Sequence, residues 1–209
     1  MIDVVREIDA IHRSVGTAPL GDGEGHAVRI SRTYDSPIED VWDALTTPER
    51  IGRWFLPING DYRLGGRYQL EGNAGGNVLS CDPPRTFSVT WEYDGHVSWV
   101  MVTLTPDGTG TELELVHDAP SAPDHWDRYG PGAVGIGWEL GLIGLAEHLT
   151  TGTPVDPAAF AAWMASEDGV GFMAACSGSW AEARIAAGDD TAESRAAAAR
   201  CTAAYTGQE

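Results

Sequence analysis

The first part of the chain carries apolar residues at helical spacing and then at strand spacing. Apolar positions separated by four, three and four residues predict a helix over residues 3–15. Its apolar face consists of Val4, Ile8, Ile11 and Val15. Gly16 and the glycine-rich stretch 21–25 predict a flexible connection. Alternating apolar positions from Val28 to Tyr34 then predict a strand.

Two helix-start signals follow this strand in close succession. The segment Ser36-Pro37-Ile38-Glu39 has the form of a capping box, with Ser36 as the N-cap and Glu39 reaching back to it. A second start signal stands at Thr47-Pro48-Glu49. The pattern predicts two short helices joined at a proline in a V-shaped element. Their buried faces are expected to carry Ile38, Val41, Trp42, Leu45, Ile51, Trp54 and Phe55.

Strand spacing dominates residues 61–118 and predicts an antiparallel meander with one buried face. Its predicted strands cover residues 62–70, 77–81, 87–93, 97–105 and 111–117. Gly65-Gly66 is interpreted as a bulge or tight bend within the first strand, with the bulge preferred, and Asp94-Gly95 as a hairpin turn. Trp91 continues the alternation of Phe87 and Val89, so it is expected to be buried on the inner face.

The last third of the chain is helical apart from one long loop. Residues 119–135, rich in Pro, Gly, Asp and Ala, predict that loop. A strong helix over 137–149 follows, with Trp138, Leu142, Leu145 and Leu149 on one stripe and Glu139, Glu147 and His148 off it. Start signals at Asp156-Pro157, Ser166 and Asp190 predict three further helices. Their apolar surface needs cover, from the core or from a second subunit in a homodimer.

The order of these elements predicts an α+β helix-grip fold. In this fold a curved antiparallel β-sheet wraps around a long C-terminal helix, and two short helices close one end. The predicted division is an N-terminal helix and linker (1–26), the helix-grip domain (27–152) and a helical C-terminal extension (153–209). Sheet curvature leaves space beneath the long helix, and an apolar space of this kind is a typical small-molecule site.

Several motifs of this chain, in order, resemble those of a known family. They are Ser36 to Trp42, Pro48 to Ile51 leading to Trp54-Phe55, Gly65 to Tyr68, Cys81 to Arg85 ending at Thr90-Trp91, Thr111 to His117, and Gly137 to Leu149. The resemblance, over about residues 27–150, is to the homologues of the activator of heat-shock-protein-90 ATPase. These belong to the START/Bet v-like (SRPBCC) superfamily, whose members bind lipids and hormones, cyclise polyketides or assist a chaperone. The resemblance implies the helix-grip fold and leaves these functions open.

Charge and composition narrow the choice of partners. Thirteen basic residues, all arginine, stand against 31 acidic ones, so the net charge is −18. Such an acidic protein repels nucleic acid and anionic lipid headgroups, so neither is expected as a partner. No apolar run approaches the roughly 20 residues that cross a bilayer, and no secretory leader is recognised at Met1, so a cytoplasmic location is expected. Three widely spaced cysteines suit a reducing compartment.

Groups capable of catalysis are few. His117 ends an alternating strand and faces inward, either as a hydrogen-bonded wall residue or as a general base that would need a carboxylate partner. The acidic and histidine residues between 117 and 127 match no metal-binding motif, and no nucleotide fingerprint is present. We therefore assign no catalytic residue, metal or cofactor.

The hypothesis that follows is a non-catalytic binding or carrier protein for an apolar or aromatic small molecule. Trp54 and Trp126 are expected at the mouth of the cavity, because amphipathic indole rings suit that position. The full set of expected ligand-binding residues is Trp54, Tyr68, Phe87, Trp91, Leu115, His117, Trp126, Trp138 and Leu142. The alternatives are a cyclase- or hydrolase-type enzyme that uses His117 and a loop carboxylate, or a protein-interaction module that assists a chaperone.

Overall fold

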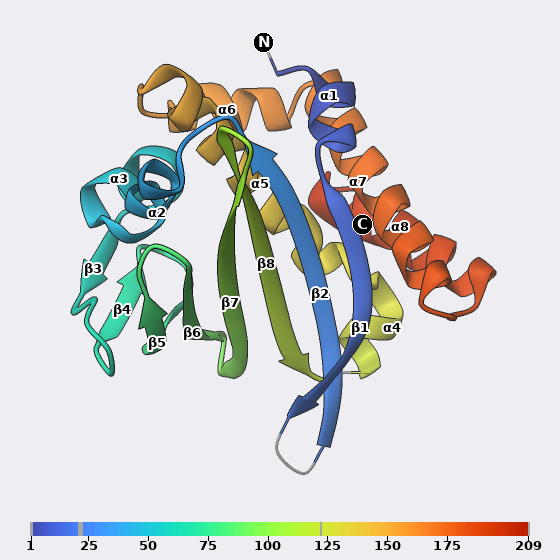
Figure 1. The fold of residues 1–209 in the computed structure, drawn as a ribbon. Helices are drawn as coiled ribbons and strands as arrows, with labels where there is room; N and C mark the ends of the chain where they lie inside the picture. The colour runs from blue at the N-terminus through green and yellow to red at the C-terminus, as the bar shows by residue number, and fades with distance from the viewer. Residues whose placement is uncertain (1, 21–22, 122, 209) are drawn as a thin grey trace. The chain divides into compact units, whose positions relative to one another are not determined.

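The computed structural model of the protein describes residues 2–20, 23–121 and 123–208. These residues form an eight-stranded antiparallel sheet in the order β1-β2-β8-β7-β6-β5-β4-β3, and several helices (Figure 1). The strands are β1 (His12–Leu20), β2 (Gly23–Tyr34), β3 (Ile58–Gly60), β4 (Arg67–Leu70), β5 (Gly75–Asp82), β6 (Thr86–Tyr93), β7 (His96–Asp107) and β8 (Gly110–Pro120). The helices are α1 (Val4–Asp9), α2 (Ile38–Thr46), α3 (Pro48–Trp54), α4 (Pro123–Tyr129), α5 (Gly132–Thr151), α6 (Pro157–Met164), α7 (Glu167–Ala186) and α8 (Thr191–Tyr205). The architecture is the expected α+β helix-grip fold.

The chain forms two compact units, which we describe separately. The first unit contains residues 1–30, 121–140 and 156–209. The second contains residues 31–120 and 141–155, that is, most of the sheet together with α2, α3 and the second half of α5.

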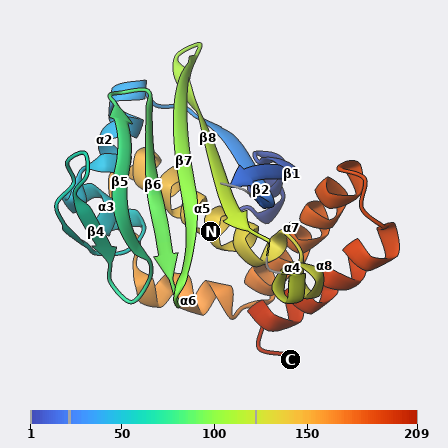
Figure 2. The ribbon, with the colours of Figure 1, turned by 90° about the horizontal axis from the view of Figure 1, so that it is seen from below.

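In the second unit, the register of the meander decides which side chains share a face. Strands β5 to β8 lie side by side in chain order (Figure 2). Phe87 lies opposite Val102, which lies opposite Leu115, so these three side chains point to the same side. By the same register, the middle of the inner face of β6 to β8 consists of Phe87, Val89, Trp91, Ser98, Val100, Val102, Leu104, Leu113, Leu115 and His117, and Tyr93, His96, Pro106 and Thr111 continue it at the strand ends. The other face carries polar and charged residues such as Ser88, Thr90, Glu112 and Glu114, but also the apolar residues Val97, Trp99, Met101 and Val116, of which Val116 is buried.

Several short-range predictions are confirmed. Tyr93 pairs with His96 across a two-residue turn in which Asp94 and Gly95 have φ of 48° and 77°. A turn of this kind requires positive φ at both positions, which is why Asp-Gly favours it. The side chains of Asp156, Ser166 and Asp190 cap α6, α7 and α8 as expected. Gly152 ends α5, with φ of 68°.

The predicted N-terminal helix over 3–15 is wrong beyond its first turns. α1 ends at Asp9, and His12–Leu20 is strand β1. Val15, Gly16 and Thr17 are poor helix formers, and pairing within the sheet gains more than extending the helix to residue 15 would. The predicted flexible connection lies partly outside the described residues, because 21 and 22 are not described, and residues 23–25 begin β2.

The capping box and the Gly-Gly bulge are also corrected. Pro37, not Ser36, is the N-cap of α2, and the Ser36 hydroxyl donates to the carboxylate of Asp40 at 2.6 Å. The predicted strand 62–70 is reduced to β4, and Gly65-Gly66 lies in a turn between β3 and β4. A Cβ on Gly66 would collide with the Asp61 carbonyl oxygen, so the turn requires glycine there.

The predicted loop 119–135 contains α4 and the first turn of α5, which begins five residues earlier than expected. In the first unit, helices of the C-terminal extension hold this segment. The Arg200 guanidinium donates to the carbonyl oxygens of Asp127 and Arg128 at 3.1 and 2.7 Å. The Tyr205 hydroxyl donates to the Ala133 carbonyl oxygen at 2.9 Å. Long-range contacts therefore order a stretch whose composition is typical of a loop.

A buried ion pair joins three distant segments of the first unit. Glu139 in α5 is 1% exposed, and its carboxylate accepts two hydrogen bonds from Arg13 of β1 at 2.8 and 2.6 Å. The same carboxylate accepts from the Trp180 indole at 2.7 Å and from the Cys176 thiol at 3.0 Å, both in α7. With these four donors the charge is fully satisfied despite its burial.

Candidate ligand-binding site

The inner face of the second unit is unevenly covered. Inward-facing side chains of β7 and β8, such as Val100, Leu113 and Leu115, are 0–4% exposed. Their neighbours on β6, Phe87 and Val89, are only half-buried although they point to the same side. Apolar residues in the interior of a filled core are fully buried. The inner face therefore combines a closed part along β7 and β8 with a more accessible apolar part along β6.

Trp91, on the inner face of β6, is less buried than the sequence predicts. It lies on the inner face as expected, but it is half-buried rather than buried. Its indole packs against a buried cluster of Ile51, Tyr68 and Leu70. The half-buried residues that surround this cluster are Phe55, Leu56, Ile58, Val89 and Trp91.

Aromatic side chains from α2 and α3 face this part of the sheet. The Trp42 indole meets the Phe87 ring edge-on, with 5.9 Å between ring centroids. Trp54 and Phe55, at the end of α3, stack with centroids 5.4 Å apart. The Trp54 indole N–H donates to the Ala44 carbonyl oxygen at 2.9 Å, which fixes the angle between the two short helices.

The second half of α5 packs closely against the end of α3, where glycines of α5 make the contact. A Cβ on Gly141 would lie 3.4 Å from the Phe55 ring, and one on Gly144 would collide with the Trp54 carbonyl oxygen. Leu142 is buried, and its carbonyl oxygen accepts from the Tyr34 hydroxyl at 3.3 Å. Small residues here let the backbone of α5 approach α3 directly.

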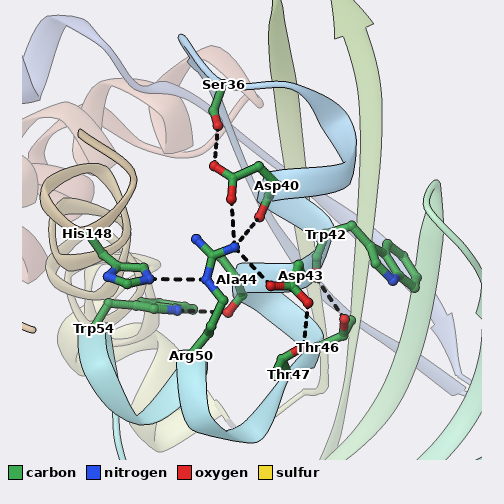
Figure 3. Close-up of polar contacts among 10 residues, drawn as sticks. All are labelled: Ser36, Asp40, Trp42, Asp43, Ala44, Thr46, Thr47, Arg50, Trp54 and His148. Carbon is green, nitrogen blue, oxygen red and sulfur yellow. Dashed lines mark hydrogen bonds and ion pairs between the residues drawn. The ribbon is translucent and has the colours of Figure 1, made fainter. Parts of the chain in front are cut away.

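A polar cluster around Arg50 holds α2, α3 and α5 together (Figure 3). The Arg50 guanidinium contacts the carboxylates of Asp40 and Asp43 at 2.6 and 3.0 Å. It also donates to the Asp40 carbonyl oxygen at 3.1 Å and to His148 Nε2 at 3.3 Å. Burial favours the neutral form of Asp40, but hydrogen bonds from Ser36 and Arg50 outweigh it, so the pKa of this carboxyl is lowered. His148, which lies off the apolar stripe, is nevertheless buried by these contacts.

Three polar side chains stand among the apolar ones on the inner face. The Tyr68 hydroxyl donates to the Thr90 carbonyl oxygen at 2.7 Å. The Ser98 hydroxyl donates to the Trp91 carbonyl oxygen at 3.1 Å, and His117 Nε2 lies 2.7 Å from the same hydroxyl oxygen. The His117 ring also meets the Trp91 indole, with centroids 6.3 Å apart.

Burial keeps these groups uncharged. Loss of solvation lowers the pKa of His117 to about 4, so the imidazole is neutral at physiological pH. Burial likewise raises the pKa of the Tyr68 phenol far above its usual value. With so low a pKa, His117 is a weak base near neutral pH, which is unfavourable for the general-base role considered from the sequence.

The structure divides the nine expected ligand-binding residues between the two units. Seven lie in the second unit: Trp54, Tyr68, Phe87, Trp91, Leu115, His117 and Leu142. Trp126 and Trp138 lie in the first unit. There the Trp126 ring stacks on His26 with centroids 3.7 Å apart, and the Arg184 guanidinium lies 5.7 Å from its centroid. A role for these two tryptophans in ligand binding stays a prediction.

Sequence reasoning missed two residues of the candidate site, Trp42 and Ser98. Helical spacing predicts Trp42 as core of the first short helix, yet it is half-buried and contacts Phe87. Ser98 lies in strand β7 among residues that alternate, and no local signal distinguishes it from a solvent-facing serine. Only the register, which places Ser98 opposite Trp91, brings it to the inner face.

The described residues were also searched for metal-binding clusters and for membrane-spanning helices. Within the described part of the chain, no group of three or more His, Cys, Asp or Glu side chains is arranged to hold a metal ion. Among the described helices, none has the length and apolar character needed to cross a bilayer.

Comparison with known proteins shows the family to which the chain belongs. The family model for the activator of Hsp90 ATPase homolog 1-like proteins matches residues 35–150, more than half of the chain. The chain belongs to this family. Its resemblance to the family, noted from the sequence motifs, is thereby confirmed. None of the curated proteins matches the chain significantly.

Solved structures of similar proteins extend the comparison beyond the family domain. The crystal structure of CalU16 from Micromonospora echinospora is 34% identical, covers 83% of this chain and 98% of its own, and has a TM-score of 0.66. The solution structure of CalU16 is 33% identical over 85% and 97% of the two chains, with a TM-score of 0.72. DynU16, a protein of the dynemicin biosynthetic locus, is 25% identical over 61% and 48% of the two chains, with a TM-score of 0.54.

Proposed function

We propose that this family member binds an apolar or aromatic small molecule without transforming it. The proposed site is the accessible apolar surface along β6, between the inner face of the sheet and the helices α2, α3 and the second half of α5. The observation that carries the proposal is the uneven cover of the inner face. Four aromatic side chains remain half-buried there: Phe55 and Trp91, which pack against the buried cluster, and Trp42 and Phe87, which contact each other.

Such a surface gains free energy when a ligand covers it. Removing apolar area from water contributes about 25 cal/mol per Å². Apolar pockets with a few fixed polar groups are the usual form of small-molecule sites, and Tyr68, Ser98 and His117 supply such groups here. The glycine contacts of α5 and the Arg50 cluster keep the surrounding helices in place, so little ordering is needed on binding.

The relatives support a small molecule from biosynthesis as the ligand class. DynU16 is named for the dynemicin biosynthetic locus, and it shares the fold and a quarter of the aligned residues with this chain. We therefore expect the ligand to be an intermediate or product of a biosynthetic pathway rather than a macromolecule. Native mass spectrometry of the purified protein can detect such a molecule if it co-purifies.

A dye-binding experiment tests the proposal on defined variants. The uncharged dye N-phenyl-1-naphthylamine should brighten on mixing with the folded protein and quench tryptophan emission. Val89→Trp fills the inner face of β6 and should abolish the brightening. Met101→Trp adds the same ring to the opposite face of the neighbouring strand, where Met101 is 43% exposed, and should leave dye binding unchanged.

Circular dichroism and thermal unfolding establish that both variants are folded. Equal loss of dye binding in the two variants would place the dye elsewhere and contradict the proposed site. A folded wild-type protein that neither brightens the dye nor carries a co-purified molecule would refute the binding function itself.

A further inference from the structure

The protons of two hydroxyl groups on the inner face of the proposed site have acceptors within the protein. Tyr68 carries one hydroxyl proton and donates it to the Thr90 carbonyl oxygen at 2.7 Å. Ser98 has two groups near its only hydroxyl proton, the Trp91 carbonyl oxygen at 3.1 Å and His117 Nε2 at 2.7 Å. A hydroxyl group whose proton is used in this way can offer a ligand only its lone pairs.

The contact between Ser98 and His117 leads to the same result for either tautomer of the imidazole. If His117 Nε2 carries a proton, it donates to the Ser98 oxygen at 2.7 Å, and the Ser98 proton goes to the Trp91 carbonyl oxygen. If Nε2 carries no proton, it can itself accept the Ser98 proton. A hydroxyl oxygen has two lone pairs, so Ser98 keeps at least one lone pair for a ligand in both arrangements.

The backbone around Tyr68 keeps its hydroxyl in this arrangement. Tyr68 in β4 lies opposite Gly76 in β5, and a Cβ on Gly76 would collide with the Thr90 carbonyl oxygen. The glycine therefore leaves that oxygen open to the tyrosine. The orientation of the Tyr68 proton is built into the sheet, because two strands and a glycine position its acceptor.

The inner face also lacks formal charge along these strands. Among the described residues, and apart from His96 at the exposed β6–β7 hairpin, the inward-facing side chains of β4 and of β6 to β8 are aromatic, aliphatic or hydroxyl-bearing, or the neutral imidazole of His117. Burying an unpaired ionised group against such a surface is strongly unfavourable, because the group loses its hydration without gaining a partner. A charged ligand group is therefore disfavoured there, whereas a neutral O–H or N–H finds acceptors.

We infer that the ligand of this site is an uncharged apolar or aromatic molecule that carries a hydroxyl or N–H donor, directed at the oxygens of Tyr68 and Ser98. The inference rests on the proposed binding function and specifies its ligand class. It distinguishes hydroxylated or amino-substituted aromatic compounds from their ethers and from aromatic acids of the same size.

Three naphthalene derivatives of matched size test this selectivity by isothermal titration calorimetry at pH 7. The probes are 2-naphthol, which has a donor, 2-methoxynaphthalene, which has only an acceptor, and 2-naphthoate, which is an anion. One additional hydrogen bond predicts that 2-naphthol binds about tenfold more tightly than 2-methoxynaphthalene. 2-Naphthoate should bind more weakly than both.

Two variants remove the acceptors one at a time. Tyr68→Phe and Ser98→Ala should each weaken 2-naphthol binding and leave 2-methoxynaphthalene binding unchanged; in the double variant the two affinities should converge. Tyr205→Phe is the matched control, because it also removes a hydroxyl that donates to a backbone carbonyl, but in the first unit. It should preserve the full preference.

The outcomes separate this inference from the function on which it rests. If all three probes fail to bind the wild-type protein, both the proposed site and the donor preference are refuted. If 2-methoxynaphthalene or 2-naphthoate binds as tightly as 2-naphthol, binding at the site is supported and the donor preference is refuted. A preference for 2-naphthol that survives in the folded double variant would also refute the assignment of Tyr68 and Ser98 as the acceptors.

Discussion

Protonation of His117 should make the stability of this protein depend on pH in a defined window. The imidazole is 6% exposed, and burial lowers its pKa from the ordinary 6.5 to about 4. Between these two values the unfolded chain binds a proton that the folded protein does not. Above pH 6.5 the imidazole is neutral in both states, and His117 does not reduce the free energy of unfolding. As the pH falls from 6.5 toward 4, protonation of the unfolded chain lowers that free energy.

The magnitude follows from the shift itself. A difference of about 2.5 pKa units corresponds to about 3 kcal/mol of unfolding free energy once the pH has reached the lower value. Between pH 7.5 and 5.5 the expected loss from His117 is about 1.3 kcal/mol. This range stays above the isoelectric point of about 4.5, where an acidic protein is prone to associate.

The perturbation is His117→Gln, whose amide can donate to or accept from Ser98 and does not titrate. Urea unfolding at pH 7.5 and 5.5 gives the free energy for the wild type and the variant. Other titrating groups act in both proteins, so the wild type should lose about 1.3 kcal/mol more than His117→Gln does. His96→Gln, at the exposed β6–β7 hairpin, should behave like the wild type. An equal loss in wild type and His117→Gln would show that His117 titrates near its ordinary pKa and is not desolvated.

The remaining predictions concern packing, the buried ion pair and thiol access. Gly144→Ala should destabilise the protein by about 1–3 kcal/mol in urea titration, because its Cβ would collide with backbone. Gly178→Ala, a helical position with open space around it, should instead stabilise it by about 0.5–1 kcal/mol, and equal effects would contradict the close approach of α5. Arg13→Met, which leaves Glu139 buried without its cation, should cost about 3–5 kcal/mol, and a loss below about 1 kcal/mol would show that the pair is solvated. In the native protein a thiol reagent should modify Cys81 rapidly and the two buried cysteines only after unfolding; rapid modification of all three would contradict the packing of α7 and α8.

The sequence determined those features that depend on neighbouring residues. Alternation along Phe87, Val89 and Trp91 defined strand β6 and its inner face. The Asp94-Gly95 turn followed from the positive φ that a two-residue hairpin requires. Helix starts in the extension followed from side chains that accept hydrogen bonds from the first turn. Each of these signals depends on residues only a few positions apart, so it can be recognised from the sequence alone.

Local reasoning failed where another partner outweighs the expected one. The spacing of apolar residues in 3–15 suits a helix, but sheet pairing satisfies the backbone of His12–Leu20 instead. Ser36 has the position of an N-cap, yet its hydroxyl is turned toward the carboxylate of Asp40 and donates its proton there. A hydrogen bond to a charged carboxylate is stronger than the bond that a neutral hydroxyl accepts from a backbone N–H.

The candidate site divides along the same line. The sequence supplied its apolar wall and the inward position of His117, because strand periodicity fixes which side chains share a face. Whether that wall is covered depends on how closely α2, α3 and α5 approach β6, and no local pattern encodes that distance. The direction of the Tyr68 proton was decided in the same way, by a carbonyl oxygen of another strand. Periodicity is a property of the chain, whereas burial and hydrogen-bond direction arise only when segments far apart in the chain meet.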